Sequence, residues 1–242
     1  MSNIVMEKMM KRLATVSAVS LALVSVPTFS YDSGDLVLRL GAATVSPNDD
    51  SSALTLNGVN LEDLGLNLPR SEAEVGDDTQ LGITATYMLN SHFGIELLAA
   101  TPFSHDIKAK GLNLDAGSTK HLPPTLSLQY YPMDSGSAFQ PYIGLGVNYT
   151  VFFDEDVDSE LNGALGTLGA TGEADLKLEN SLGLAAQVGM DYAIDEHWVV
   201  NAAVWYIDID TDAEFDVPGL GKIEADVGID PLTYILAVGY KF

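Results

Sequence analysis

The residue types that most often carry catalysis are sparse in this chain and match no known site. There is no cysteine, which excludes disulfides, thiolate metal sites and a cysteine nucleophile. The four histidines belong to no H-E-x-x-H motif and never pair at i, i+4; they are His92, His105, His121 and His197. A G-x-S-x-G nucleophile elbow is also missing. The sequence therefore predicts neither an enzyme nor a bound metal or cofactor.

Acidic side chains dominate the charge, and they gather in runs at 154–160 and 208–216. A calcium-binding EF-hand loop starting at Asp208 would need Gly and Glu where Ala213 and Gly219 stand, so that motif is excluded. The carboxylates could bind lipopolysaccharide phosphates through divalent cations, or simply form a solvated surface. The net charge of −23 argues against a nucleic-acid partner, because phosphate contacts need Lys and Arg.

The first 30 residues have the pattern of a secretory signal peptide. A basic segment ending at Arg12 precedes the apolar stretch Leu13 to Val26, and small residues precede the predicted cleavage after Ser30. This stretch of 14 residues is shorter than the roughly 20 that a membrane-spanning helix needs, and no other window holds 18 uncharged apolar residues. We therefore predict a signal peptide over 1–30 and an exported domain over 31–242.

Along the exported part, large apolar residues alternate with small or polar residues. In the closing stretch one face carries Tyr234, Leu236, Val238, Tyr240 and Phe242. The opposite face carries Thr233, Ile235, Ala237, Gly239 and Lys241. An apolar face with terminal aromatics, opposite a small or polar face, is typical of a membrane-barrel strand. The same division predicts eight strands, near 35–45, 79–89, 92–103, 121–132, 139–153, 176–194, 197–211 and 223–242.

Short and long connections alternate between these strands. The long ones are polar or acidic and lie near 46–78, 104–120, 154–175 and 212–224. Tight periplasmic turns with longer external loops are the pattern of bacterial outer-membrane barrels. The predicted fold is all-β: an eight-stranded antiparallel transmembrane β-barrel with short periplasmic turns and long extracellular loops.

Alternation also assigns candidate functional residues to the lumen. Four charged side chains face inward, and since a charge inside a barrel must be paired or hydrated, we predict an ion-pair floor of Arg39, Glu96, Asp191 and Lys241. Leu98 and Trp205 face the lumen as well. They could form an apolar constriction, or fill the core of a barrel whose interior has room only for side chains.

Five segments, in order along residues 35–242, carry a further signal: Gln80–Met88 (QLGITATYM), Gly94–Phe103 (GIELLAATPF), His121–Leu126 (HLPPTL), Pro141–Thr150 (PYIGLGVNYT) and Val204–Thr211 (VWYIDIDT). They resemble the OmpW family of outer-membrane proteins, which includes the alkane-uptake protein AlkL. The resemblance implies an eight-stranded outer-membrane barrel that passes small hydrophobic molecules inward, with sideways exit through the barrel wall. The family's hydrophobic lumen gate matches Leu98 and Trp205. The segments 46–78 and 154–175 depart from the family pattern, so the resemblance does not name the solute.

The long loops hold more leucines than solvent-facing loops usually do. Those of the first are Leu54, Leu56, Leu61, Leu64, Leu66 and Leu68, with Val59 among them. Those of the third are Leu161, Leu165 and Leu168. They could line a hydrophobic funnel above the membrane, or pack against one another in short loop helices.

We therefore predict an outer-membrane channel for passive uptake of small hydrophobic molecules, monomeric and without cofactor, in contact with outer-membrane lipids and lipopolysaccharide. Its terminal Tyr240 and Phe242 resemble the signal that the barrel-assembly machinery recognises. An interaction or structural protein, whose acidic loops bind surfaces, phage or partners, is the alternative. A lipid-modifying enzyme would need Ser, His and Asp assembled at the rim. Transport predicts an apolar lumen open outward or through the wall, whereas interaction predicts a fully plugged lumen and sheet-like loops.

Overall fold

A computed structural model describes residues 30–48, 50–64, 72–110 and 112–242. The predicted signal peptide lies outside these residues apart from Ser30, and so do Leu66 and Leu68 of the first long loop. Within the described ranges, no helix is both long and apolar enough to cross a membrane.

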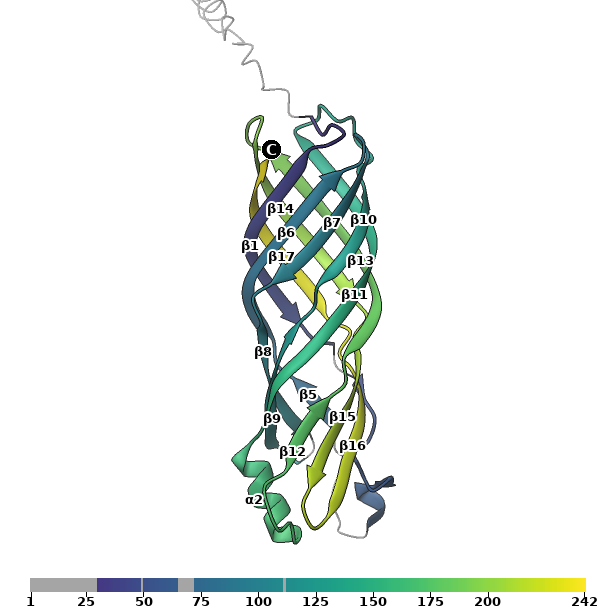
Figure 1. Cartoon of the computed structure of the whole chain (residues 1–242), viewed down its shortest axis with the longest axis vertical. Coiled ribbons are helices and arrows are strands. Elements are labelled where there is room, and N and C mark those ends of the chain that lie inside the picture. Colours follow the sequence, from purple (N-terminus) through teal and green to yellow (C-terminus); the bar gives the residue numbers. More distant parts are fainter. Residues whose placement is uncertain (1–29, 49, 65–71, 111) are drawn as a thin grey trace, which may run out of the picture.

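Eight long antiparallel strands close into a barrel, as predicted (Figure 1). They are β1 (Leu36–Ser46), β6 (Asp78–Met88), β7 (Phe93–Ala100), β10 (Thr125–Tyr130), β11 (Phe139–Val157), β13 (Ser181–Ala193), β14 (Trp198–Ile207) and β17 (Leu232–Lys241). Their order around the barrel is β10-β7-β6-β1-β17-β14-β13-β11, and β10 also pairs with β11, which closes the ring. Because every strand has two neighbours, the ring has no free edge. A sheet that spans a membrane must be closed in this way, since unpaired backbone groups are costly in lipid.

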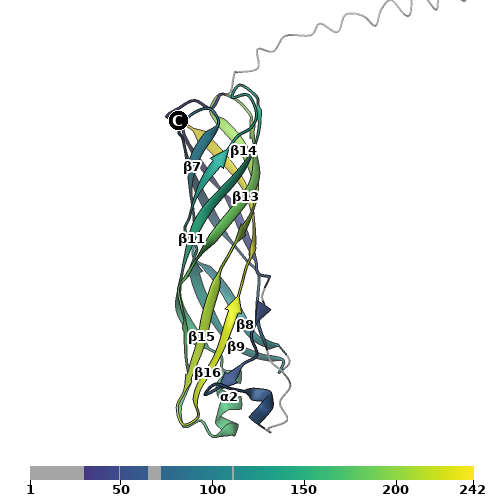
Figure 2. The same ribbon diagram turned by 90° about the vertical axis from the view of Figure 1, so that its right-hand side faces the viewer.

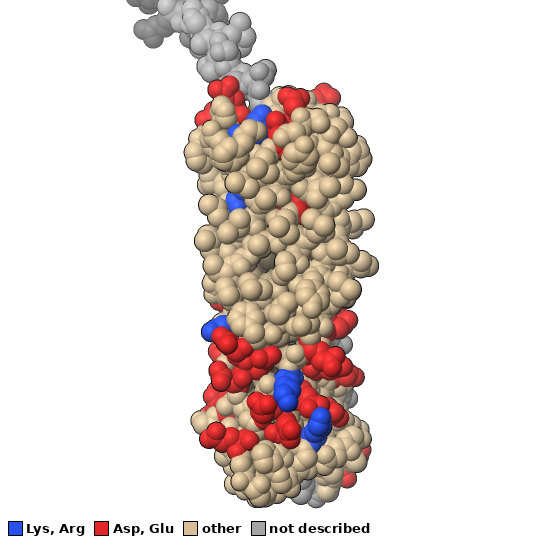
Figure 3. All heavy atoms as spheres, viewed as in Figure 1, with Lys and Arg blue, Asp and Glu red and all other residues tan. Residues whose placement is uncertain are grey.

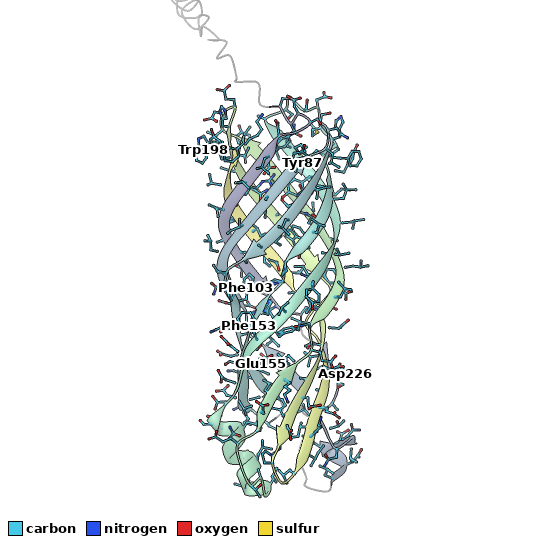
Figure 4. All side chains as sticks on the ribbon, in the orientation of Figure 1. Tyr87, Phe103, Phe153, Glu155, Trp198 and Asp226 are labelled. Atoms are coloured by element: carbon cyan, nitrogen blue, oxygen red, sulfur yellow. The ribbon has the colours of Figure 1, made fainter. Side chains whose placement is uncertain are left out.

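The outer face of this barrel is an apolar band with aromatic girdles. Leu145, Leu182 and Leu236 are 68–77% exposed, which in a barrel crossing a bilayer is exposure to lipid. The periplasmic girdle comprises Tyr87, Phe93, Tyr130, Phe139, Tyr192, Trp198 and Phe242, of which Figure 4 labels Tyr87 and Trp198. The outer girdle comprises Tyr149, Tyr206 and Tyr234. Figure 3 shows the band almost free of charge between two charged ends.

The long outer connections are largely folded into strands, which extend the barrel away from the membrane (Figures 1 and 2). The sequence pattern predicts long polar or acidic connections near 104–120, 154–175 and 212–224. The structure places there all or part of β8 (Phe103–Lys110), β9 (Leu114–Leu122), β15 (Asp210–Val217) and β16 (Gly221–Gly228). Three predicted strands, 176–194, 197–211 and 223–242, are interrupted, at residues 179–180, 208–209 and 229–231. We call this extracellular part, with the outer end of β11, the tower.

Two sheets build the tower. In one, the outer end of β11 pairs with β9, then β8 and β5 (Glu72–Val75). In the other, the order is β12 (Asp175–Leu178), β15, β16, β3 (Thr55–Leu56) and β4 (Val59–Asn60), with β2 (Asp50–Ser51) also on β16. A hydrogen bond from the amide of Ala73 to Oγ of Ser51 joins the sheets on one side. Inward residues of both sheets share one apolar interior.

Two short helices stand at the outer end of the tower. The α-helix α2 (Ser159–Leu168) starts at Asp158, whose side chain accepts a hydrogen bond from the amide of Glu160. It ends at Gly169, whose φ of 108° is the left-handed conformation that glycine adopts without strain. A 3-10 helix, η1 (Leu61–Leu64), lies in the first long connection.

Candidate functional site

A buried ion-pair network occupies the periplasmic half of the lumen. Asp191 accepts hydrogen bonds from Nε and Nη2 of Arg39 at 2.9 and 2.5 Å. Glu96 accepts one from Nη1 of Arg39 at 3.0 Å. These three residues come from β1, β7 and β13, and each is about 1% exposed or less. The guanidinium therefore bridges two carboxylates on separate walls of the barrel.

Neutral side chains complete the hydrogen bonding of both carboxylates. Asp191 also accepts from the Tyr31 hydroxyl at 2.7 Å and from Asn201 at 2.9 Å. Glu96 accepts from Thr86 at 2.8 Å and from Gln187 at 3.1 Å. Buried charges that keep a full set of partners avoid most of the penalty of an unpaired charge. We call this network the plug; its members are Tyr31, Arg39, Thr86, Glu96, Gln187, Asp191 and Asn201.

Glycines on the lumen face make room for the plug. Gly239 pairs with Arg39 across β17 and β1, and a Cβ built on it would lie 2.8 Å from Cγ of Arg39. Gly144 pairs with Gln187, and its Cβ would lie 2.7 Å from Cγ of Gln187. The small residues that alternate along the lumen face thus leave room for long polar side chains to fold across the barrel.

Lys241 does not join the plug, which corrects the predicted four-membered floor. Its ammonium donates to the carbonyl of Ser30 at 2.6 Å and lies 3.5 Å from a carboxylate oxygen of Asp35. The reason is its height in the barrel: Lys241 pairs with Val37 at the periplasmic end of β1, one pair below Tyr240 and two below Gly239. Its charge is paired at the rim.

Four members of the plug, Tyr31, Thr86, Gln187 and Asn201, are not part of the predicted ion-pair floor. Three of them fall on the lumen faces of predicted strands, so alternation would have placed them inside the barrel. Tyr31 precedes the first strand and gave no such signal. It is fully buried, and its ring stacks edge-on against Tyr131 with centroids 5.1 Å apart.

Leu98 and Trp205 are buried in the lumen, 4% and 1% exposed. Leu98 lies two residues beyond Glu96 on β7, which places it on the extracellular side of the plug. Both side chains belong to an apolar cluster that includes Val45, Phe103 and Ile207. Beyond the plug the lumen therefore gains large apolar side chains, which lie beside the buried polar residues Thr125, Asn148 and Thr233.

The barrel wall is interrupted beside Leu98. Pairing between β7 and β10 ends at Leu98–Thr125, and pairing between β8 and β9 begins at Phe103–His121. The intervening residues 99–102 and 122–124 pair with each other at no position, and they include Pro102, Pro123 and Pro124, which lack an amide hydrogen. A small cavity lies here, lined by Ala43, Val45, Leu98, Ala99, Ala100, Phe103, Pro123, Ile207 and Thr233.

The loop leucines converge on an apolar pocket at the outer end of the tower. It is lined by Leu54, Leu56, Leu61 and Leu64 of the first connection and by Leu161, Leu165 and Leu168 of α2, among others. The sequence allowed either a hydrophobic funnel or packing of the leucines in short loop helices. Both features are present, because short helices form and the leucines also line a pocket. A second apolar cavity, deeper in the tower, shares Leu54, Ala73, Ile107 and Phe215 with this pocket.

The remaining candidate residues lie at the two ends of the molecule. Tyr240 packs against Trp198, and Phe242, 65% exposed, donates its amide to the carbonyl of Leu36. Their predicted role in assembly stays a prediction. Across the described ranges, no group of three or more His, Asp or Glu has a metal-binding arrangement, and no serine is hydrogen-bonded to a histidine.

A closed eight-stranded barrel with an apolar outer band, aromatic girdles and a polar plug is an integral β-barrel of the bacterial outer membrane. The OmpW family model matches residues 32–242. Outer membrane protein W of Vibrio cholerae is 44% identical, covering 96% of this chain and all of that protein. The crystal structure of OprG from Pseudomonas aeruginosa is 47% identical with a TM-score of 0.78, covering 88% of this chain and 98% of that one.

Outer membrane protein AlkL of Ectopseudomonas oleovorans is 26% identical, covering 88% of this chain and 84% of that protein. The solid-state NMR structure of AlkL has a TM-score of 0.59 against this chain. The chain belongs to the OmpW family, as the sequence motifs predicted.

Proposed function

We propose that this protein conducts small hydrophobic molecules passively across the outer membrane, with entry through the tower and exit sideways through the wall. The observation that carries the proposal is the order of the lumen. Apolar side chains line the outer pocket, the tower cavity and the wall cavity beside Leu98, and the polar plug closes the barrel below them.

The path has three stages. The outer pocket and the tower cavity share lining residues, so a solute could pass from one to the other. Phe103 and His121, with ring centroids 5.4 Å apart, separate the tower cavity from the wall cavity. Figure 4 shows Phe103 where the barrel passes into the tower. Leu98 then lies at the unpaired wall, and Trp205 belongs to the same cluster.

The plug favours a sideways exit because it obstructs the straight route through the lumen. A straight route to the periplasm would break hydrogen bonds of buried charges, which costs several kcal/mol. At the wall interruption, by contrast, no backbone pair between the β7–β8 and β9–β10 segments has to break. An apolar solute gains free energy by entering the bilayer, at about 25 cal/mol per Å² of apolar surface removed from water.

The test is uptake into liposomes that contain the purified protein, with octane or a fatty acid compared with a sugar. We expect octane to enter faster than into protein-free liposomes while the sugar stays outside. Trp205→Ala and Leu98→Ala are expected to change octane uptake and leave sugar exclusion intact. The matched control is Leu97→Ala, because Leu97 lies next to Leu98 on β7 but faces the lipid, 48% exposed. Equal exclusion of octane and sugar by the wild type would refute the channel.

A cross-link tests the exit separately. The chain has no cysteine, so Ala100→Cys combined with Pro123→Cys gives a single possible disulfide across the wall cavity. We expect octane uptake to fall on oxidation and to recover on reduction in the same liposomes. Uptake that is unchanged by an oxidised cross-link would rule out sideways exit while leaving transport itself intact.

The folded tower favours a second candidate function, recognition of a basic surface or partner. Its strands present acidic side chains outward, seen as the red belt in Figure 3, and Glu155 and Asp226 are labelled in Figure 4. Asp212 pairs directly with Asp226, and Glu214 with Glu224. Sheet-like connections and a closed lumen are what the interaction hypothesis predicted. Neutralising these four carboxylates should abolish such binding and leave octane uptake unchanged; binding that survives would refute this function.

A further inference from the structure

Two histidines stack inside the tower, above the outer aromatic girdle. His105 on β8 and His121 on β9 have ring centroids 4.9 Å apart and ring planes 17° from parallel. Each is 3% exposed. Phe103 and Phe152 pack on the His121 ring, with centroids at 5.4 and 5.8 Å. Both histidines line the apolar tower cavity, on the path from the outer pocket to the wall.

The hydrogen bonding of these rings is incomplete. Nδ1 of His105 lies 2.5 Å from the carbonyl oxygen of Gly76. Because a carbonyl oxygen only accepts, Nδ1 carries the hydrogen of a neutral ring and Nε2 is left as an acceptor. Among the described residues, Nε2 of His105 and both ring nitrogens of His121 are buried without a hydrogen-bond partner. A neutral His121 therefore carries one unused donor and one unused acceptor beside the cavity.

Burial favours the neutral form of both rings. Burial, followed by the neighbouring His105, lowers the pKa of His121 to about 3, against the opposing effect of Asp78. Burial also lowers the pKa of His105, although the bond to Gly76 and the charges of Asp78, Asp77 and Asp106 oppose the shift. A buried polar atom without a partner costs on the order of 1–3 kcal/mol. A solute that completes the bonding of these nitrogens recovers part of that cost.

The arrangement does not suit a metal ion. The lone pair of an imidazole nitrogen lies in the ring plane, and two nearly parallel stacked rings do not aim their lone pairs at one point. The surroundings also lack a third ligand: the cavity walls are apolar apart from Thr119 and Thr211, and no carboxylate lines them. What fits is a neutral group that both donates and accepts a hydrogen bond, attached to an apolar body.

We propose that the His105–His121 pair is a polar binding site on the uptake path, which selects hydrophobic molecules bearing a hydroxyl group. The hydroxyl hydrogen is donated to a free ring nitrogen, and its oxygen accepts from the protonated nitrogen of His121. The hydrocarbon part lies against Ile107, Phe152 and Ile209 in the same cavity. This site rests on the proposed function, because it requires that solutes enter the tower.

The test measures binding directly in lipid nanodiscs that hold the full chain, with empty nanodiscs as the reference. The probes are 1-octanol and octane, which differ by one hydroxyl. Imidazole nitrogen NMR signals of the wild type should shift on adding octanol and stay unchanged with octane. The shifts should be confined to His105 and His121, leaving His197, exposed in a periplasmic turn, as the internal reference.

The matched variants are His121→Phe, which keeps an aromatic ring in the stack, and His197→Gln. We expect His121→Phe to weaken octanol binding about five- to tenfold, the effect of one lost hydrogen bond. Octane binding should be unchanged in either variant. Octanol that binds no better than octane to the wild type, or equally well to His121→Phe, would overturn the site.

Failure of this proposal is distinguishable from failure of the proposed function. If octanol and octane enter liposomes at the same rate through the wild type and His121→Phe, the channel stands and the site is refuted. If octanol shifts the histidine signals but neither solute crosses, the site stands as a binding site and conduction is refuted. A His121→Phe protein that does not fold still leaves the wild-type NMR titration decisive.

Discussion

Removing one carboxylate from the plug should cost more stability at Asp191 than at Glu96. Asp191 accepts two hydrogen bonds from the Arg39 guanidinium, together with one from Tyr31 and one from Asn201. Glu96 accepts only one from Arg39. Asp191→Asn turns an amide NH₂ toward groups that are themselves donors, and it breaks the bidentate ion pair between Arg39 and residue 191. Glu96→Gln leaves that ion pair in place.

The expected magnitudes follow from these bonds. Breaking a buried ion pair costs about 3–5 kcal/mol, which is the loss expected in the free energy of unfolding of Asp191→Asn. Losing one charge-assisted hydrogen bond costs about 1.5–3 kcal/mol, the loss expected for Glu96→Gln. The control is Glu173→Gln, because Glu173 is exposed in the tower and the change should stay within about 0.5 kcal/mol.

Urea titration in lipid vesicles measures these differences. The chain has two tryptophans, Trp198 in the periplasmic girdle and Trp205 buried beyond the plug, so fluorescence reports unfolding from both levels of the barrel. Equal losses for the two variants, or a loss for Asp191→Asn no larger than for the control, would refute the assignment of Asp191 as the main partner of Arg39.

Three further outcomes are expected. Gly239→Ala should lower the free energy of unfolding by about 1–3 kcal/mol, because its Cβ would lie 2.8 Å from Cγ of Arg39, and an unchanged urea midpoint would contradict this. Asp226→Lys should slow amide exchange in the tower, since it replaces a like-charge pair with Asp212 by an opposite pair worth about 0.2–1 kcal/mol; faster exchange would count against it. Because the pKa of His121 is about 3 in the folded protein and near 6.5 in an unfolded chain, only the unfolded chain binds the proton between these values. Tower stability should therefore fall by up to about 1.4 kcal/mol per unit as pH drops from 6.5 toward 3, and amide exchange of β8 and β9 should lose this pH dependence in His121→Phe.

Alternation in the sequence was sufficient to assign side chains to the two faces of the barrel. Arg39, Glu96, Leu98, Asp191 and Trp205 all face the lumen, as their positions in the pattern predicted. This works because side-chain direction in a strand is local: successive residues point to opposite faces whatever the strand pairs with. Alternation and the spacing of short and long connections also predicted eight strands and an outer-membrane barrel, and the family motifs implied the same fold.

The strands of the tower could also have been found by alternation. Phe103, His105, Ile107 and Ala109 point inward on β8, between outward Ser104, Asp106, Lys108 and Lys110. The polarity of that segment instead predicts a long connection near 104–120. Outward positions in the tower face water, so their polarity says nothing against a strand.

Which inward residues meet was decided by the tertiary structure alone. Lys241 has the same parity as Arg39 but lies lower in the barrel and pairs with Asp35, whereas Tyr31, outside any strand, reaches Asp191. His105 and His121 stack only because β8 and β9 pair in one register. Height, register and the interruption of the wall depend on hydrogen bonds between distant segments. The sequence by itself thus determined the barrel and its faces, while long-range pairing determined the plug, the wall opening and the histidine pair.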